Sequence, residues 1–318
     1  MTEITHRTID AGGISLHIAE AGPAGGPVVL LLHGFPECWY SWRRQMTALA
    51  EAGYRAVAPD QRGYGGSDAP GTVDAYTIFD LVGDVIGVLD AVGAERAVVV
   101  GHDWGAPVAW HTALLRPDRV RGVVGLSVPL EPRPRRTPTA AIERRFGPHH
   151  YMLYFQQLGV ADAELGADPR GFLRRLFAAT SGTGTPTAPS AEHGFLTALP
   201  ETDALPAWLT EEDLDVYTQT FAEHGFTGGL NWYRNLDRNW ALTRPWRDAR
   251  VTPPARYLAG EADLVVGGRT VDVLVESMSQ VVADLRGVAL LPGCGHWTQQ
   301  EQPDEVNAAL LEFAASLP

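Results

Sequence analysis

A strand followed at once by a tight turn and a helix is the feature that most constrains this chain. Residues 98–100 are three consecutive valines, and an unbroken run of β-branched residues is typical of a buried strand. The run ends at Gly101, and residues 104–115 suit a helix. Asp103 is therefore predicted to stand on the turn between them, with Gly101 and Gly105 two positions away on either side. A Cβ atom at either glycine would collide with so tight a turn.

This arrangement has two interpretations. A strained strand–turn–helix connection lifts one side chain above the carboxyl end of a sheet, which is the geometry of a nucleophile elbow. Here the nucleophile position holds the carboxylate of Asp103 and no serine, which excludes a serine esterase. The alternative is an ordinary junction in which Asp103 caps the helix N-terminus, a frequent role for aspartate. The rest of the chain has to decide between the two.

Apolar stretches that suit buried strands alternate with stretches that suit helices over much of the chain. The predicted strands are residues 28–32, 55–59, 98–100, 120–128, 255–259 and 288–292. The predicted helices outside the middle of the chain are residues 41–51, 78–92 with Thr77 and Asp80 as a capping box, 104–115, and a final helix from Pro303. This alternation predicts an α/β fold with a mostly parallel sheet flanked by helices. An alternating apolar–polar pattern over residues 6–20 predicts an antiparallel hairpin at the start.

The alternation stops in the middle of the chain. Residues 129–246 contain helical stretches, such as 148–158 and 211–222, but no clear buried strand. We interpret this block as a helical cap inserted into one sheet domain. The predicted domains are an α/β-hydrolase core of residues 1–128 and 247–318 and a helical cap of residues 129–246. Within the cap, residues 181–189 are rich in glycine, serine, threonine and proline and are predicted to be a mobile loop.

Composition excludes several classes of function. The net charge of −13 argues against nucleic acid or an anionic membrane as partner. All 25 basic residues are arginine, which excludes Schiff-base and pyridoxal chemistry because both need a lysine amine. Cys38 and Cys294 match no metal-ligand spacing, and no apolar segment has the form of a signal or a membrane span. We therefore expect a cytoplasmic protein, a monomer or homodimer, that uses neither a metal nor a cofactor.

Two polar residues after the last two predicted strands complete a candidate constellation. A carboxylate nucleophile needs a base to release its ester, and that base needs an acidic partner to orient it. His296 follows the strand at 288–292, and Asp263 follows the strand at 255–259. The chain order Asp103, Asp263, His296 is the nucleophile–acid–histidine order of α/β-hydrolases. Glu131 is the alternative to Asp263 as the acid.

The loop after the strand at 28–32 is a candidate for half of an oxyanion hole. It reads His33-Gly34-Phe35-Pro36, in the position that supplies one backbone amide in α/β-hydrolases. The amides of Phe35 and Trp104 would then converge on a developing oxyanion. For the His33 side chain we expect a structural role within the loop.

Three motifs together resemble the soluble epoxide hydrolases of the α/β-hydrolase superfamily. They are His33-Gly34-Phe35-Pro36, Gly101-His102-Asp103-Trp104-Gly105 and Gly293-Cys294-Gly295-His296-Trp297. Two cap segments, residues 150–156 and 231–235, extend the resemblance to the whole chain. It implies that Tyr151 and Tyr233 donate hydrogen bonds to the epoxide oxygen, with Tyr154 as the alternative to Tyr151. A phenol suits this task because it is protonated at pH 7.

The resemblance also implies a mechanism. Asp103 attacks an epoxide carbon to form an alkyl-enzyme ester, His296 activates a water that hydrolyses it, and a vicinal diol leaves. The expected partners are water and a small lipophilic epoxide. The residues expected to line an apolar substrate pocket are Trp39, Met152, Phe155 and Trp297.

Two other functions fit parts of the sequence. A hydrolytic haloalkane or haloacid dehalogenase uses the same aspartate and histidine, and Trp104 could help to hold a halide. Against it, haloalkane dehalogenases usually carry asparagine where Phe35 stands, and the paired cap tyrosines are left unexplained. A non-catalytic ligand receptor on the same fold is the second alternative. Asn231, Asn235 and Asn239 recur every four residues, a stripe that suits either a polar lining or a solvated face.

Overall fold

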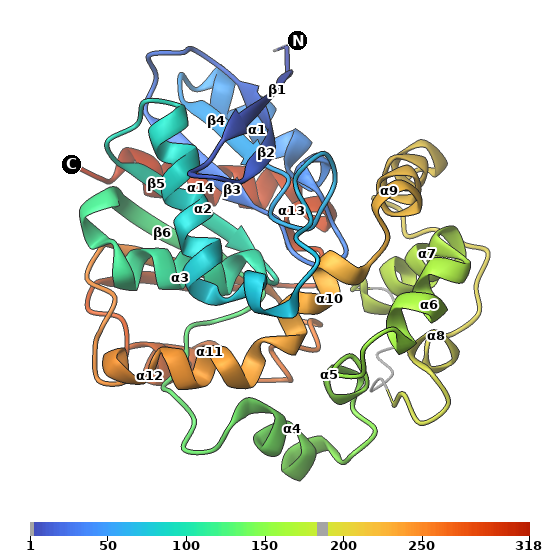
Figure 1. Cartoon of the computed structure of the whole chain (residues 1–318). Coiled ribbons are helices and arrows are strands. Elements are labelled where there is room, and N and C mark those ends of the chain that lie inside the picture. The colour runs from blue at the N-terminus through green and yellow to red at the C-terminus, as the bar shows by residue number, and fades with distance from the viewer. Residues whose placement is uncertain (1–2, 183–189) are drawn as a thin grey trace.

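An eight-stranded sheet forms the centre of the computed structural model, which describes residues 3–182 and 190–318 (Figure 1). Its strands are β1 (Thr5–Asp10), β2 (Ser15–Ala21), β3 (Val28–Leu32), β4 (Arg55–Pro59), β5 (Ala97–His102), β6 (Val120–Leu126), β7 (Ala255–Gly260) and β8 (Leu285–Leu291). They lie in the order β1-β2-β4-β3-β5-β6-β7-β8. The hairpin β1–β2 and the pair β2–β4 are antiparallel, and the other neighbours are parallel. The predicted fold class is confirmed.

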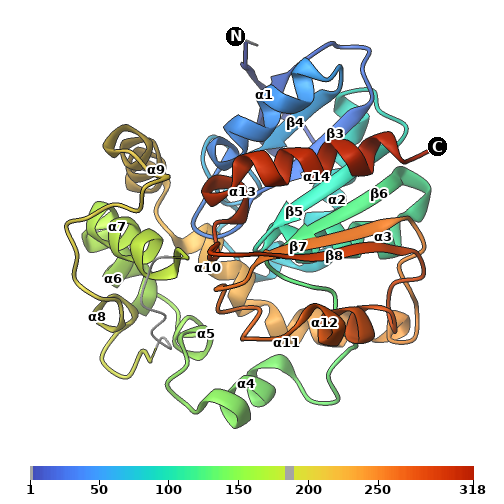
Figure 2. The same cartoon turned by 180° about the vertical axis from the view of Figure 1, so that it is seen from behind.

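Helices cover both faces of this sheet. The core helices are α1 (Arg43–Glu51), α2 (Ile78–Ala91), α3 (Gly105–Leu115), α12 (Val271–Met278), α13 (Thr298–Glu301) and α14 (Pro303–Ala315). Figures 1 and 2 show α2 and α3 on one face and α1 and α14 on the other. Successive side chains of β3 pack against helices on opposite faces of the sheet. Leu30 packs in the cluster with α2 and α3, whereas Leu31 packs with α1 and α14. Burial on both faces explains why the central strands are unbroken apolar runs.

The turn after β5 has the strain that its sequence predicts. Asp103 adopts a φ of 48°, a left-handed conformation that costs a non-glycine residue on the order of 1–3 kcal/mol. A Cβ on Gly101 would lie 2.0 Å from the carbonyl oxygen of Gly105. A Cβ on Gly105 would lie 2.1 Å from the carbonyl oxygen of Leu32. The predicted collision is therefore confirmed at both glycines, and the turn lifts Asp103 above the carboxyl end of the sheet.

The described residues between β6 and β7 form helices and no strand. These helices are α4 (Pro138–Phe146), α5 (Tyr151–Tyr154), α6 (Val160–Ala167), α7 (Pro169–Thr180), α8 (Phe195–Ala198), α9 (Glu211–His224), α10 (Thr227–Arg234) and α11 (Leu236–Leu242). Short 3₁₀ turns occur at Trp39–Trp42, Val73–Tyr76, Pro117–Arg119 and Arg244–Trp246. Figures 1 and 2 show α5 to α9 beside the sheet as a separate group of helices. We propose residues 129–246 as the extent of this cap.

One predicted helix of the cap is much shorter in the structure. The sequence pattern favours a helix over residues 148–158, but α5 ends at Tyr154. In a longer helix, the backbone carbonyl groups after Tyr151 would accept hydrogen bonds from main-chain amides. Here side chains donate to several of these carbonyls instead. The Gln156 amide donates to the carbonyl of Met152, and the Arg234 guanidinium donates to the carbonyls of Phe155 and Gln157. Most of the loop predicted at residues 181–189 lies outside the described residues.

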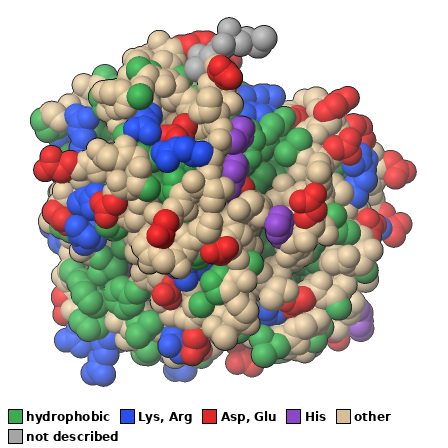
Figure 3. All heavy atoms as spheres, turned by 45° about the horizontal axis from the view of Figure 1, so that its top comes forward, with side chains coloured by type: hydrophobic (Ala, Val, Ile, Leu, Met, Phe, Trp, Pro, Cys, Tyr) green, Lys and Arg blue, Asp and Glu red, His purple; other side chains and the backbone are tan. Residues whose placement is uncertain are grey.

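The surface and the helices agree with an ordinary globular protein. On the face that Figure 3 shows, acidic and basic side chains of the described residues are interspersed, without a continuous basic patch. In the part of the chain that the structure describes, no helix combines the length and the apolar composition needed to cross a membrane.

The capping box at the start of α2 can be tested by mutation. The hydroxyl of Thr77 accepts from the amide of Asp80, and the carboxylate of Asp80 accepts from the amide of Thr77 at 3.0 Å. We expect Thr77→Ala to lower the free energy of unfolding by about 1 kcal/mol, because the amide of Asp80 loses its acceptor. Urea denaturation measures this change. Thr72→Ala is the matched control, since Thr72 precedes a 3₁₀ turn without a capping bond, and an equal loss there would contradict the assignment.

Candidate active site

The Asp103 carboxylate lies against the backbone amide of Phe35 at the carboxyl end of the sheet. The amide of Phe35, from the loop after β3, donates to Asp103 Oδ1 at 2.8 Å. The amide of Trp104 is the next group along the chain, and it has no acceptor among the described residues. The structure therefore brings together the three groups that the sequence assigned to the nucleophile and the oxyanion hole.

His296 lies between Asp103 and Asp263. Its Nε2 atom is 3.6 Å from Asp103 Oδ2, and its Nδ1 atom is 3.1 Å from Asp263 Oδ1. Asp263 is buried, and its Oδ1 also accepts from the amide of Val265 at 2.9 Å. Loops after β5, β7 and β8 supply the three side chains, because parallel strands place their carboxyl ends at one edge of the sheet.

A fourth polar residue, Ser127, completes this group. Its hydroxyl donates to Asp263 Oδ2 at 2.6 Å and lies 3.0 Å from His296 Nδ1. Ser127 follows β6 directly and has a φ of 69°. The sequence analysis missed it, because the strand predicted at 120–128 was drawn two residues too long and hid a polar residue at the strand end.

The alternative acid, Glu131, lies elsewhere. Its carboxylate forms an ion pair with Arg269, and its side chain is 49% exposed. Glu131 borders the cavity described below, but it makes no hydrogen bond with His296 among the described residues. The geometry therefore favours Asp263 as the partner of His296.

The three titratable groups shift one another's pKa values. Burial alone would raise the pKa of Asp103, but the hydrogen bond and positive charge of His296 lower it below its usual value. The pKa of Asp263 is lowered in the same way, with burial opposing and the charge of His296 prevailing. Burial would lower the pKa of His296, yet the charges of Asp263 and Asp103 raise it well above its ordinary value. The resting site therefore holds an imidazolium between two carboxylates.

A second buried pair supports His296 from behind. His102 Nδ1 is 2.8 Å from Glu37 Oε2, and His102 Nε2 is 2.8 Å from the carbonyl oxygen of His296. Since a carbonyl only accepts, Nε2 must carry a hydrogen. Glu37 also accepts from the side-chain amides of Gln299 and Gln300. The side chains of His102 and Glu37 are fully buried, so this hydrogen-bonded pair fixes the main chain at His296.

Two tyrosines from the cap face the Asp103 carboxylate across a cavity. Tyr151 and Tyr233 both line this cavity, and their ring centroids are 6.2 Å apart. Burial and then the charge of Asp103 raise the pKa of each phenol, so both remain neutral hydrogen-bond donors. The alternative residue, Tyr154, donates its hydroxyl to Glu164 at 2.9 Å and does not line the cavity.

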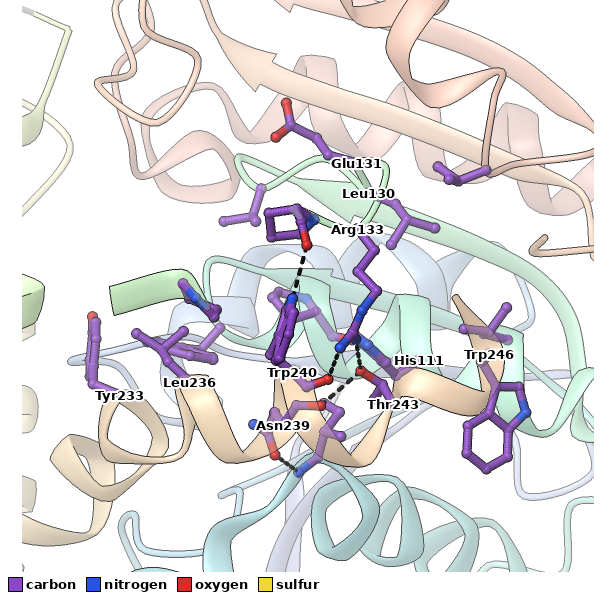
Figure 4. Close-up of a pocket in the computed structure, with 18 of the residues that line it drawn as sticks. His111, Leu130, Glu131, Arg133, Tyr233, Leu236, Asn239, Trp240, Thr243 and Trp246 are labelled. Carbon is purple, nitrogen blue, oxygen red and sulfur yellow. Dashed lines mark hydrogen bonds between the residues drawn. The ribbon is translucent and has the colours of Figure 1, made fainter. Parts of the chain in front are cut away.

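The cavity has a volume of about 390 Å³ and extends far beyond the tyrosines. Figure 4 shows it running from Tyr233 at one end to Trp246 at the other. Apolar side chains dominate its lining, notably Leu114, Val128, Leu130, Leu236, Trp240 and Val281. Such a lining suits a lipophilic molecule.

Only Met152 of the four predicted pocket residues lines this cavity. Trp39 lies away from it, with its ring edge against His6. Phe155 is fully buried behind Tyr233, with 5.1 Å between ring centroids. Trp297 is buried, and its indole donates to the hydroxyl of Thr180. Trp39, Phe155 and Trp297 therefore do not line this cavity, because aromatic content alone does not show which direction a side chain faces.

The asparagine stripe fastens the cap to the core. Asn235 Nδ2 donates to the carbonyl of Val73 at 2.7 Å, and Asn239 Oδ1 accepts from the amide of Ile78 at 2.8 Å. Asn231 is buried and accepts from Arg234. Only Asn239 of the three reaches the cavity.

Comparison with known proteins gives a consistent result. Residues 27–303 match the family model described as the alpha/beta hydrolase fold. The chain is 49% identical to "Epoxide hydrolase A" of Mycobacterium tuberculosis (strain ATCC 25618 / H37Rv), over 98% of each chain. It is 41% identical to "Epoxide hydrolase 1" of Siraitia grosvenorii, over 98% of this chain and 99% of that protein. The crystal structure of Epoxide Hydrolase A from Mycobacterium thermoresistibile aligns with a TM-score of 0.93 and 49% identity, covering 99% of each chain.

The charge coupling within the site predicts a change in the pKa of His296. Asp103→Asn removes one of the two negative charges that stabilise the imidazolium. The pKa of His296 should therefore fall, by about one unit or more. NMR titration of protein with labelled histidine measures it. Glu131→Gln is the control, because Glu131 pairs with Arg269 instead, and an unchanged pKa in Asp103→Asn would contradict the coupling.

Proposed function

The chain belongs to the alpha/beta hydrolase fold family and is an epoxide hydrolase, and from this premise we propose that it forms a covalent ester on Asp103. The observation that carries the proposal is the position of this carboxylate. It lies between the amide of Phe35 and the imidazole of His296, in the cavity that Tyr151 and Tyr233 also line. One side of the site thus supplies a nucleophile, and the other supplies acids for the leaving oxygen.

In the proposed first step, Asp103 attacks one epoxide carbon and the carbon–oxygen bond breaks. The low pKa of Asp103 keeps it ionised for this attack. Negative charge develops on the epoxide oxygen, and the hydroxyls of Tyr151 and Tyr233 donate hydrogen bonds to it. One of them transfers its proton, giving the alcohol of the ester intermediate. Because the donors are already positioned in a cavity with a mostly apolar lining, they stabilise the developing charge strongly.

In the proposed second step, His296 activates water. Esterification removes the negative charge of Asp103, and with it one of the groups that raise the pKa of His296. The imidazolium then gives up its proton more easily, the phenolate left by the first step takes up that proton, and the neutral imidazole acts as a general base. His296 takes a proton from water as the water attacks the carboxyl carbon of Asp103, and the amides of Phe35 and Trp104 stabilise the tetrahedral oxyanion. Asp263 stabilises the imidazolium that forms. The ester bond then breaks, the leaving oxygen takes the proton of the new carboxyl group, and the diol leaves with Asp103 ionised again.

The tyrosine assignment predicts a slower first step in phenylalanine variants. Tyr151→Phe or Tyr233→Phe should lower the rate of alkylation roughly 10- to 1000-fold, the effect expected for loss of one positioned donor. Stopped-flow tryptophan fluorescence under single-turnover conditions measures this rate.

Tyr154→Phe is the matched control for these variants. It removes a hydroxyl bonded to Glu164, outside the cavity, and should leave the alkylation rate within about twofold, as for a surface change. Rapid alkylation in Tyr151→Phe together with slow alkylation in Tyr154→Phe would reverse the assignment.

The ester mechanism predicts where solvent oxygen goes. In one turnover with excess enzyme in heavy-oxygen water, the diol should carry no label, because its new oxygen comes from Asp103. Mass spectrometry should find the label in the peptide that contains Asp103.

A variant at the base separates the two steps. His296→Gln should still be alkylated but should not hydrolyse the ester, so intact-protein mass spectrometry should detect an adduct of one substrate mass. A labelled diol from the first turnover of the unmodified enzyme would instead mean that water attacks the epoxide directly.

A further inference from the structure

The cavity continues along α3 and α11, beyond the groups that the proposed reaction uses (Figure 4). Most of this part is apolar, so the polar atoms that border it call for an explanation. His111 from α3 and Asn239 from α11 both line it. Neither belongs to the catalytic group around Asp103.

His111 presents a hydrogen-bond acceptor to the cavity. Its Nδ1 atom is 2.7 Å from the carbonyl oxygen of Pro107, so Nδ1 carries the hydrogen. Burial lowers the pKa of His111 and keeps the ring neutral, which leaves Nε2 without a hydrogen. Nε2 has no partner among the described residues, and it is not one of the fully enclosed unpaired atoms. It is therefore accessible from the cavity.

Asn239 presents a hydrogen-bond donor. The amide of Ile78, at the start of α2, lies 2.8 Å from one end of the Asn239 side chain. Because a backbone N–H donates, that end must be the oxygen, and the NH₂ group is the other end. In the described part of the chain this NH₂ group has no acceptor, and it is not enclosed.

Two neighbouring polar side chains, Thr243 and Arg133, already make hydrogen bonds within the protein. The hydroxyl of Thr243 donates to the carbonyl of Asn239 and accepts from Arg133. Arg133 also donates to the carbonyl of Trp240, and its guanidinium lies 4.3 Å from the centroid of the Trp240 ring. His111 Nε2 is thus left as a neutral acceptor and Asn239 Nδ2 as a neutral donor, beside the N–H groups that Arg133 has left.

We propose that His111 and Asn239 form a polar subsite that binds a hydroxyl group carried by the substrate at a distance from its epoxide ring. A hydroxyl can donate to Nε2 and accept from Nδ2 at once, whereas a carboxylate or ketone can only accept. The inference deepens the proposed function and rests on it, because a substrate held here presents its epoxide to Asp103. The substrate class is a long-chain epoxide with a remote alcohol.

The spacing along α3 sets the length of this substrate. His111 lies six residues after Gly105, the first residue of α3, which corresponds to about 9 Å along the helix, and Asp103 lies two residues before the helix, so the separation is roughly 12 Å. An extended alkyl chain advances about 1.25 Å per bond, so about nine or ten bonds span that distance. The compound 10-hydroxy-1,2-epoxydecane has the required length.

The test compares this alcohol with 1,2-epoxydecane and 9,10-epoxydecanoic acid. For each compound, diol formation gives kcat/KM, and the measured quantity is the ratio of the alcohol to the unsubstituted epoxide. His111→Phe keeps a ring of similar size but removes the acceptor, and it should lower this ratio about five- to tenfold. His111→Gln restores an acceptor and should keep the ratio within about twofold of the unmodified enzyme.

Two further variants sharpen the result. Leu114→Met changes the shape of the same wall without a polar atom, and it should alter both rates by the same factor. Asn239→Leu should lower the ratio like His111→Phe, and urea denaturation checks that the lost bond to Ile78 has not unfolded the protein.

Three outcomes would overturn the subsite. An unchanged ratio in His111→Phe would mean that His111 does not accept a hydrogen bond from the substrate hydroxyl, and it would leave the proposed function intact. A preference for the acid, lost in Arg133→Met and kept in His111→Phe, assigns this end of the cavity to an anion. Absence of diol from all three compounds overturns the proposed function and the subsite with it.

Discussion

An ionised carboxylate has to persist inside the protein, and the site is arranged around that requirement. Burial disfavours the charge on Asp103, as it does for any buried acid. The amide of Phe35 compensates by a hydrogen bond of 2.8 Å, and the imidazolium of His296 compensates by its charge at 3.6 Å. The positive charge of His102, next to Asp103 in the chain, adds to the effect. The left-handed backbone conformation of Asp103 is strained. The same turn brings the carboxylate within reach of these groups, and their interactions with it offset the strain.

The groups that stabilise the charge of Asp103 are themselves held in place by further hydrogen bonds. His296 stays protonated in the resting site because Asp263 holds its Nδ1 atom, and Ser127 in turn donates to Asp263. Glu37 and His102 hold the main chain at His296 from the opposite side. These residues come from five different loops or strand ends, and only a parallel sheet gathers so many carboxyl ends at one edge. The fold therefore supplies the electrostatics, and the loops supply the particular groups.

Much of this arrangement is predictable from the sequence, and the exceptions have physical causes. The central strands and the position of Asp103 follow from apolar runs and from glycines that tolerate no Cβ. Ser127 was hidden because a strand pattern does not mark its last residue sharply. The length of α5 depends on Arg234, which reaches back to the carbonyl of Phe155 from far along the chain. Trp297 carries an apolar ring that suits a pocket or a core equally, and only packing distinguishes the two.

Burial raises the pKa of both kinds of acid in the site, but the neighbouring charges act on them in opposite directions, and the proposed chemistry uses both results. For Tyr151 and Tyr233, burial and the nearby negative charge act in the same direction, so each phenol keeps its proton. For Asp103, burial and the nearby positive charges act in opposite directions, and the charges prevail. One cavity thus holds a carboxylate that has lost its proton beside phenols that retain theirs, even though burial raises the pKa of acids in general. Because the charge of Asp103 itself helps to keep the phenols neutral, the loss of that charge in the proposed ester would lower the pKa of both phenols.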